Sequence, residues 1–451
     1  MRSVSRSIRF LVIVGAVLSL GVASHAGTPG RPVREVPASG VAFPPSILSS
    51  AKIQHVIWVM QENRSFDNLF QGYPGADTVP SGKDSSGNTI ALTPITLATP
   101  WDIDHSSTAF FQACNGTAQG RSCKMDGFNL EQSGADRKTY PYPQYGYVPH
   151  SESQLYFEIA KQYVLGDRMF TSHIDASYIS HQYMIAGQAN RAVDFPSGMW
   201  GCTKRQNVIP TLSDRRAYGH KIPVCQNYQT LGDELDAAGI SWRVYAATRT
   251  QYISWAGYRS IRHIRFGPDW KADVIPSSAR FLTDVKNGNL ASMTWVTPTC
   301  ANSDHASCQS AHGPDWVASV INAVGESPFW DTTVIFVMWD EWGGWYDHVK
   351  PPYEDFDGLG LRVPLLVVSP YAKRNYVSHV QYEHGSLLRF AEDEFGLARL
   401  AASDTRANSP APDCLDFNQK PRAFVPFKTK LGAADFVRTE PQEAAESPDT
   451  E

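Results

Sequence analysis

Two apolar runs in this chain end abruptly in side chains that carry oxygen. Residues 56–60 read VIWVM and residues 334–339 read VIFVMW. The side chains that follow the two runs are Glu62 and Asn63 after the first, and Asp340 and Glu341 after the second. Short, continuously apolar runs are typical of strands buried on both faces of a parallel sheet. In open α/β folds, ligand sites lie at the carboxyl ends of such strands.

More apolar runs recur along the chain, with helical patterns between them. They read SWRVYAA from Ser241, MTWVTPT from Met293 and LLVVSP from Leu365. ESQLYFEIAKQYV and PDWVASVINAV have the periodicity of helices. This alternation predicts an α/β fold with a mostly parallel central sheet and helices on both faces. The polar stretches 75–150 and 195–230 are interpreted as loop insertions, where function often resides.

The two strand ends together suggest a metal site. Carboxylate and amide oxygens are the ligands that hard divalent cations prefer. If the two strands are neighbours, these four side chains meet at one edge of the sheet. The alternative is two unrelated polar turns at the surface.

Three further residues can supply chemistry beside a metal. Ser177 precedes a helical pattern in HIDASYISHQYMIAGQ, and a hydroxyl near a divalent metal can act as a nucleophile. The alternative is that Ser177 only caps the helix. His105 in WDIDHSS and His305 in NSDHAS can donate a proton or offset phosphoryl charge. A structural hydrogen-bonding role is the alternative for either histidine.

The two ends of the chain differ in composition from its middle. Basic residues precede the apolar run FLVIVGAVLSLGVA, and SHA precedes Gly27, which predicts a signal peptide over residues 1–26. The run is shorter than the roughly 20 residues of a membrane-spanning helix. We therefore expect export to the periplasm or the medium, with no transmembrane segment in the mature protein. A Pro-rich leader is expected at 27–50, a catalytic domain at 51–427 and an acidic, disordered tail at 428–451.

Charge and cysteine content narrow the class of protein. A formal net charge of -5 gives no electrostatic basis for binding nucleic acid. The 7 cysteines agree with an oxidising compartment. Neighbouring cysteines can close three local loops, with Cys414 left over; the pairs are Cys114 with Cys123, Cys202 with Cys225, and Cys300 with Cys308. Spacing alone does not establish this connectivity.

Several blocks resemble the phosphoesterase family that holds bacterial phospholipases C and a group of secreted acid phosphatases. The matching segments, in the family's order, are HVIWVMQENRSFDNLFQGYPG, CKMDGF, DASYISHQYMIAG, SDHAS, VMWDEWGGWYDHVKPP and LRVPLLVVSPYAKRNYVSHVQYEHGSLLRFAED. They span nearly the whole mature chain, and the E-N-R-S-F-D and D-E-x-G-G-x-Y-D-H blocks are specific. The chain is identified as a member of this family.

The resemblance implies an alkaline-phosphatase-like fold with one divalent metal, of unspecified identity, at the strand ends. The implied metal ligands are Glu62, Asn63, Asp340 and Glu341. Ser177 falls at the nucleophile position, and His105 and His305 match histidines around the phosphate. His348 and His384 also lie in matching blocks, but the resemblance assigns them no role.

The resemblance also bears on the substrate. Phospholipase members often read P-T-x-P-N around the nucleophile, whereas this chain has Ser177 there. We therefore expect a phosphomonoesterase of the acid phosphatase kind that forms a phosphoserine intermediate.

Two other functions stay open. One is a phospholipase C that cleaves phosphatidylcholine, in which aromatic side chains hold the choline cation. Its candidate aromatic residues, which can equally belong to the core, are Trp339, Trp342, Trp345 and Tyr346. The other is a secreted binding protein that has lost catalysis.

Overall fold

The computed structural model describes residues 52–440, apart from residues 118, 199, 204–206 and 247–254. The predicted signal peptide and Pro-rich leader lie outside the described residues, as does the chain after residue 440. No described helix is long and apolar enough to cross a membrane.

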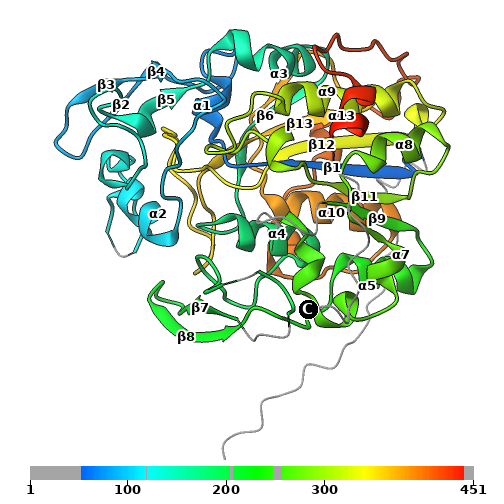
Figure 1. Ribbon diagram of the computed structural model, residues 1–451, viewed down its shortest axis with the longest axis horizontal. Coiled ribbons are helices and arrows are strands. Elements are labelled where there is room, and N and C mark those ends of the chain that lie inside the picture. The colour runs from blue at the N-terminus through cyan, green and yellow to red at the C-terminus, as the bar shows by residue number, and fades with distance from the viewer. Residues whose placement is uncertain (1–51, 118, 199, 204–206, 247–254, 441–451) are drawn as a thin grey trace, which may run out of the picture. The chain divides into compact units, whose positions relative to one another are not determined.

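An eight-stranded sheet forms the centre of the fold (Figure 1), in the order β10-β9-β11-β1-β12-β13-β6-β14. In that order, the strands are Val274–Ile275, Trp242–Tyr245, Met293–Val296, His55–Gln61, Thr333–Trp339, Arg362–Val368, Val164–Phe170 and Tyr376–Ser378. Neighbouring strands are parallel except where β13 pairs with β12 and β6. Only β13 runs against the rest, so the expected mostly parallel sheet is confirmed.

Strands β1 and β12 lie side by side in the middle of the sheet. Their pairing aligns Met60 with Met338 and Gln61 with Trp339. Six of the seven β1 residues and all seven β12 residues are buried. Because the two strands are parallel and in register, the residues that follow them leave the sheet at the same edge.

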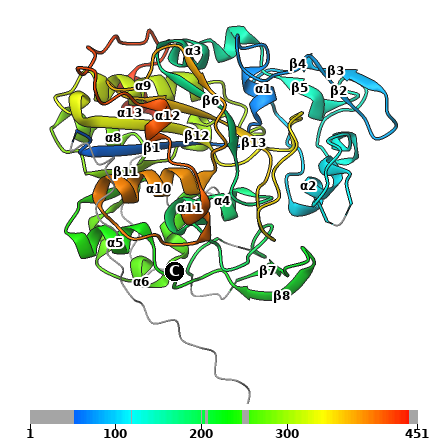
Figure 2. The same cartoon turned by 180° about the vertical axis from the view of Figure 1, so that it is seen from behind.

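Helices cover both faces of the sheet (Figures 1 and 2). One face carries α3 (His150–Gln162), α8 (Arg280–Lys286), α9 (Gly313–Gly325) and α13 (Ala433–Thr439), with α9 in contact with the other three. The other carries α4 (Ser177–Ala186), α5 (Leu231–Ala238), α10 (His384–Phe395) and α11 (Ala402–Arg406). The two helices predicted from periodicity correspond to α3 and α9.

The two polar insertions carry their own small elements. Residues 75–150 contain β2 (Ser81–Lys83), β3 (Thr89–Ala91), β4 (Thr93–Pro94), α2 (Ser107–Cys114) and β5 (Gly146–Tyr147). Residues 195–230 contain β7 (Val208–Leu212) and β8 (Tyr218–Pro223). The remaining α-helices are α1 (Phe66–Phe70), α6 (Arg262–Arg265), α7 (Asp269–Ala272) and α12 (Ala411–Cys414).

The C-terminal boundary differs from the expectation. Residues 428–440, which we assigned to a disordered tail, are ordered and include α13. Phe436 of α13 is buried against Trp316 of α9, with ring centroids 5.2 Å apart. The Glu440 carboxylate accepts hydrogen bonds from the backbone N–H groups of Ser278 and Ala279 at 2.6 and 2.7 Å. The segment has a polar composition. The Phe436 ring and the Glu440 carboxylate hold it against the core.

The three expected disulfides are present. They join Cys114 to Cys123, Cys202 to Cys225 and Cys300 to Cys308. Cys414 is free and buried, and burial raises the pKa of its thiol to about 12.

Strand β6 was not predicted, because its sequence VLGDRMF carries a charged pair in the middle of a strand. The Asp167 carboxylate is fully buried and lies 2.8 Å from Nδ1 of His379, while it accepts the Asp77 N–H at 2.9 Å. A buried carboxylate is tolerated in a strand when its oxygens have such partners.

His348 belongs to a cluster of charged side chains that holds the loop after β12 in place. The other members are Asp67, Asp77, Asp347 and Arg362. The Arg362 guanidinium contacts Asp347 at 2.8 Å and lies 3.6 Å from Asp67. His348 Nδ1 lies 2.6 Å from the Asp67 carboxylate, and Nε2 lies 3.1 Å from that of Asp77. The cluster therefore ties residues 347–348 to the segment after β1 and to β13.

Replacing His348 by Gln should destabilise the protein more at pH 6 than at pH 9. Burial alone would lower the pKa of His348, but the Asp67 and Asp347 carboxylates outweigh burial and raise it. A raised folded pKa means that the stabilisation is complete below the unfolded value of about 6.5 and is lost as pH rises through the folded pKa. We expect a loss of about 1–3 kcal/mol at pH 6.

Urea unfolding of both proteins at pH 6 and pH 9 measures this difference. The Arg362 guanidinium stays charged throughout this range, and the pKa of Asp77 is lowered, so its carboxylate stays ionised. An equal loss of stability at the two pH values would contradict the charged role of His348.

Candidate active site

Helix α4 meets the ends of β1 and β12 through three side chains on one of its faces. Ser177, the first residue of α4, donates from Oγ to Asn63 Oδ1 at 3.4 Å. One turn further along, Ser180 Oγ donates to the Asp340 backbone carbonyl, and His181 Nε2 lies 2.9 Å from Glu62 Oε1. Positions i, i+3 and i+4 share one helix face. One and a half turns of α4 therefore contact Asn63, Asp340 and Glu62.

The turn after Asp340 presses closely against Asn63. Gly343 has φ 66°, and a Cβ atom there would lie 2.3 Å from the Asn63 carbonyl oxygen. A side chain would therefore clash as well as strain the backbone. Asn63 itself has φ 58°, a conformation that asparagine tolerates better than most residues. The glycines of the D-E-x-G-G block thus let two strand ends approach each other.

Each of the three carboxylates at this edge has one oxygen held by the protein and one without a partner. The held oxygens are Glu62 Oε1, Asp340 Oδ1 and Glu341 Oε2; their donors, in that order, are His181 Nε2 at 2.9 Å, the Asn63 N–H at 2.8 Å and the Gly343 N–H at 2.7 Å. The oxygens without a hydrogen-bond partner among the described residues are Glu62 Oε2, Asp340 Oδ2 and Glu341 Oε1. This pattern leaves one oriented oxygen per side chain for a ligand.

These side chains have few positive partners within the protein; His105, 3.6 Å from Glu341, is the nearest cationic group among the described residues. Glu62, Asp340 and Glu341 are fully buried, and no lysine or arginine of the described residues forms an ion pair with them. Burial, with the charge of Asp340, raises the pKa of Glu62 far above its ordinary value, and burial raises that of Glu341 to about 8. Such carboxylates fit a bound cation. Their oxygen donors suit a divalent metal.

Ser177 does not act as a helix cap. The N-cap of α4 is Ala176, and no side chain caps this end. The Ser177 hydroxyl instead points to Asn63, beside the carboxylates. The alternative interpretation of Ser177 as a cap is therefore wrong.

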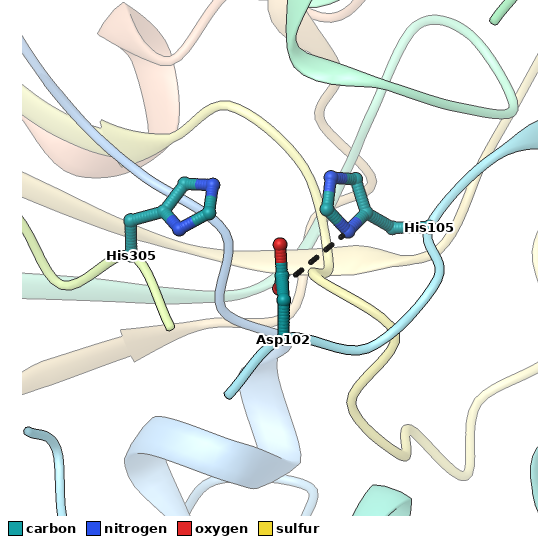
Figure 3. Close-up of side chains that lie close together, drawn as sticks. All are labelled: Asp102, His105 and His305. Carbon is teal, nitrogen blue, oxygen red and sulfur yellow. Dashed lines mark ion pairs between the residues drawn. The ribbon is translucent and has the colours of Figure 1, made fainter. Parts of the chain in front are cut away.

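The two predicted histidines lie together beside these groups, with Asp102 between them (Figure 3). Their ring centroids are 6.2 Å apart, and His105 Nδ1 lies 4.0 Å from the Asp102 carboxylate. His105 Nδ1 contacts the Ile103 carbonyl at 2.7 Å, so Nε2 faces Asn63 at 3.3 Å and Glu341 at 3.6 Å.

The surroundings shift the pKa values of the two rings in opposite directions. Burial alone would lower the pKa of His105, but the Glu341 and Asp102 carboxylates raise it to about 9. Burial lowers the pKa of His305. These shifts favour a charged His105 and a neutral His305 near neutral pH, a split typical of an acid and a base in one site.

Ser177 and the two histidines open into a cavity of about 740 Å³. The two insertions form much of its wall, through Asp102, Asp104 and residues 132–134 from the first and Phe195 and Trp200 from the second. Trp255 also lines it. The lining contains two aspartates and three large aromatic residues, but no lysine or arginine among the described residues.

The tryptophans after β12 do not reach this cavity. Trp339, Trp342 and Trp345 are fully buried, and Tyr346 is nearly so. Trp339 Nε1 donates to Asp304 at 2.9 Å, and Trp345 packs under the Arg64 guanidinium. They belong to the core, so the role in choline binding that we considered for them is wrong.

The strand ends of this α/β sheet place three buried carboxylates beside a serine hydroxyl that does not cap its helix. This arrangement is typical of a metal-assisted esterase. Residues 53–398 match the Phosphoesterase family. The chain belongs to this family, as the sequence predicted, and it is a hydrolase that acts on phosphoric ester bonds. The alternative of a non-catalytic binding protein is therefore set aside.

Relatives with similar sequences are phospholipases C. The chain is 26% identical over 439 residues to non-specific phospholipase C6 from Arabidopsis thaliana, covering 87% of this chain and 78% of that protein. It is 26% identical over 398 residues to a non-hemolytic phospholipase C from Burkholderia pseudomallei, covering 76% and 55%. Phospholipase C B from Mycobacterium tuberculosis is 24% identical, covering 76% and 74%.

Solved structures overlap the chain only remotely. A protein in the alkaline phosphatase superfamily from Vibrio parahaemolyticus has a TM-score of 0.38 and 9% identity, covering 82% of this chain and 76% of that one. Murine ectonucleotide pyrophosphatase/phosphodiesterase 5 has a TM-score of 0.35 and 10% identity, covering 59% and 93%.

Some residues of the site were missed from the sequence. His181 and Asp102 lie four and three residues from predicted site residues, spacings that could have flagged them. Phe195 and Trp200 stand in loops and Trp255 in a single 3-10 turn, where no periodicity indicates the direction of a side chain. His384 is buried at the start of α10, 3.5 Å from the Trp339 carbonyl.

Proposed function

We propose that this protein is a metal-dependent phosphodiesterase of the phospholipase C type, with Ser177 as its nucleophile. One divalent cation would be held by Glu62, Asn63, Asp340 and Glu341. The observation that carries the substrate class is the lining of the cavity at Ser177. Two aspartates and three aromatic rings, without a lysine or arginine among the described lining, suit a diester one of whose alcohols is a cation. The names of the relatives support the same class.

The cation would supply two effects: it lowers the pKa of the nearby serine hydroxyl and offsets charge on the phosphoryl oxygens. Ser177 Oγ loses its proton to water and attacks phosphorus in line; the bond between Oγ and phosphorus forms as the bond to the leaving oxygen breaks. His105, a cation whose Nε2 faces the ligand carboxylates, gives its proton to the leaving alcohol. Water then attacks the phosphorus of the serine ester, and the bond from phosphorus to Ser177 Oγ breaks. Neutral His305 takes a proton from the attacking water, the Ser177 oxygen takes one from solvent, and both histidines regain their starting charges by proton exchange with water.

A second substrate class is a phosphomonoester, as the sequence favoured. The observation behind it is the serine at the nucleophile position, which resembles the acid phosphatase branch of the family. A dianionic monoester would depend on the cation and on His105 for neutralisation, because no lysine or arginine of the described residues lines the cavity.

A direct comparison of two chromogenic substrates tests the substrate class. We expect p-nitrophenyl phosphorylcholine to be hydrolysed with a higher kcat/KM than p-nitrophenyl phosphate, and a chelator to abolish both reactions. Trp200→Leu should raise KM for the choline ester by about tenfold, because a cation–π contact contributes roughly 1–2 kcal/mol. The same change should leave the monoester reaction within about twofold.

Preference for the monoester, with no effect of Trp200→Leu, would overturn the diester proposal and support the phosphatase. Activity that survives complete chelation would overturn the metal. Export into an oxidising compartment is also part of the proposal, and the three disulfides support it.

A further inference from the structure

His181 has a place in the site that its sequence context did not suggest. Its side chain is 1% exposed, and Nε2 lies 2.9 Å from Glu62 Oε1. Among the described residues, the donor to Glu62 Oε1 is His181, and Oε2 has no hydrogen-bond partner. The orientation of this carboxylate therefore depends on one imidazole.

The other two carboxylates of the site are oriented differently. Asp340 and Glu341 each accept a hydrogen bond from a backbone N–H, of Asn63 and Gly343, which no substitution of a side chain removes. Glu62 alone depends on a side chain, and that side chain comes from α4, the helix that also carries Ser177. One turn of α4 separates His181 from Ser177, so the two residues are displaced together when the helix shifts.

We infer that His181 is a positioning residue that aims Glu62 at the cation and keeps helix α4, with Ser177 at its start, in register with the metal ligands. The inference rests on the proposed metal centre. It assigns His181 no contact with substrate and no bond to the cation.

The physical reason is that a carboxylate without a hydrogen bond can rotate, and binding a cation would then cost the free energy of fixing its orientation. With Nε2 on Oε1, the lone oxygen Oε2 already faces the ligand position before the cation arrives. Hydrogen bonds that orient a metal ligand typically change metal affinity by 10- to 100-fold. Because Glu62 is fully buried, no solvent can take over this hydrogen bond.

Three substitutions of His181 make the test specific. Glutamine places its amide nitrogen about as far along the side chain as Nε2, whereas asparagine reaches only about as far as Nδ1. We expect His181→Gln to bind Mn2+ or Zn2+ within about threefold of the wild type. His181→Asn and His181→Ala should weaken binding by roughly 10- to 100-fold.

Titration of each cation into chelator-treated protein, followed by calorimetry, gives the dissociation constants without reference to activity. Tyr178→Phe is the matched control. It removes another buried hydrogen bond of α4, from the Tyr178 hydroxyl to the Val224 carbonyl at 2.9 Å, on a side chain that does not contact Glu62. This control should lose stability and keep its metal affinity.

Equal affinities for the asparagine, alanine and wild-type proteins would overturn the role of His181 while leaving the metal centre intact. That role would also be overturned if glutamine and asparagine weakened binding equally, because the reach of the donor would then not matter. A wild-type protein that binds neither cation would overturn the proposed metal centre itself, and the assignment of His181 with it.

Discussion

Ser177→Ala is expected to reduce kcat on any phosphoric ester by about 10³-fold or more, because removing a nucleophile removes the covalent route. The thermal stability of the variant should stay close to that of the wild type. The hydroxyl makes a long hydrogen bond of 3.4 Å to Asn63 and does not cap α4, so its loss disturbs little of the fold. Rapid-quench measurement of a phosphorylated protein should detect the intermediate in the wild type and none in the variant.

Ser180→Ala is the matched control for this experiment. Ser180 is a buried serine on the same face of α4, and its hydroxyl donates to the Asp340 carbonyl. Ser180 Oγ also lies 2.7 Å from His173 Nε2, so the change removes two hydrogen bonds. Their loss should lower stability by about 2 kcal/mol and should keep activity within about tenfold. Full activity in Ser177→Ala, or an equal loss in both variants, would show that Ser177 is not the nucleophile.

Asp340→Asn is expected to abolish activity and to remove the stabilisation of the protein by metal. In the wild type, Asp340 Oδ2 has no hydrogen-bond partner among the described residues. Asparagine can still accept the Asn63 N–H through its oxygen, but its amide nitrogen takes the place of Oδ2. The cation therefore loses a ligand, and its affinity should fall by more than about 100-fold, beyond the effect of an orienting residue. Without metal, the variant should be more stable than the wild type by about 1–3 kcal/mol, because a buried carboxylate next to two other carboxylates is replaced by a neutral amide.

Thermal unfolding with and without a divalent cation measures both effects. At a concentration 100 times Kd, the cation should stabilise the wild type by about 2.7 kcal/mol and the variant hardly at all. Asp284→Asn serves as control, since the Asp284 carboxylate is also buried but has Tyr245 and Arg280 as partners at 3.0 and 2.7 Å. This control should lose stability with or without metal. A metal-free Asp340→Asn protein that is less stable than the metal-free wild type would contradict the role of Asp340 as a ligand.

Much of the central sheet could be predicted because the signal is local. The five apolar runs named from the sequence correspond to β1, β9, β11, β12 and β13, and the two helical patterns to α3 and α9. A strand that is buried on both faces has no position exposed to solvent. Its sequence is therefore a continuous apolar run, which can be recognised directly. Strand β6 has no continuous apolar run, because it contains Asp167. The partners that allow this carboxylate to be buried are residues 77 and 379, which are distant in sequence.

The cavity wall could not be predicted in the same way. Trp339 and Trp342 adjoin the metal-ligand candidates in sequence, yet they are buried in the core. Phe195 and Trp200 lie in a polar insertion and line the cavity. Proximity in sequence to an acidic pair says nothing about the direction of an aromatic side chain at a glycine turn. The contacts that set these directions come from elements distant along the chain.

The sequence by itself determined the strands, the acids at their ends and the family, because each depends on a few consecutive residues. Only the tertiary structure decided that β1 and β12 are neighbours in register, and that β13 runs against both of its neighbours. It alone placed His181 on Glu62 and the insertion aromatics around Ser177. The physical reason is that these are contacts between separate segments of the chain, whose geometry follows from how the strands, helices and loops pack as a whole.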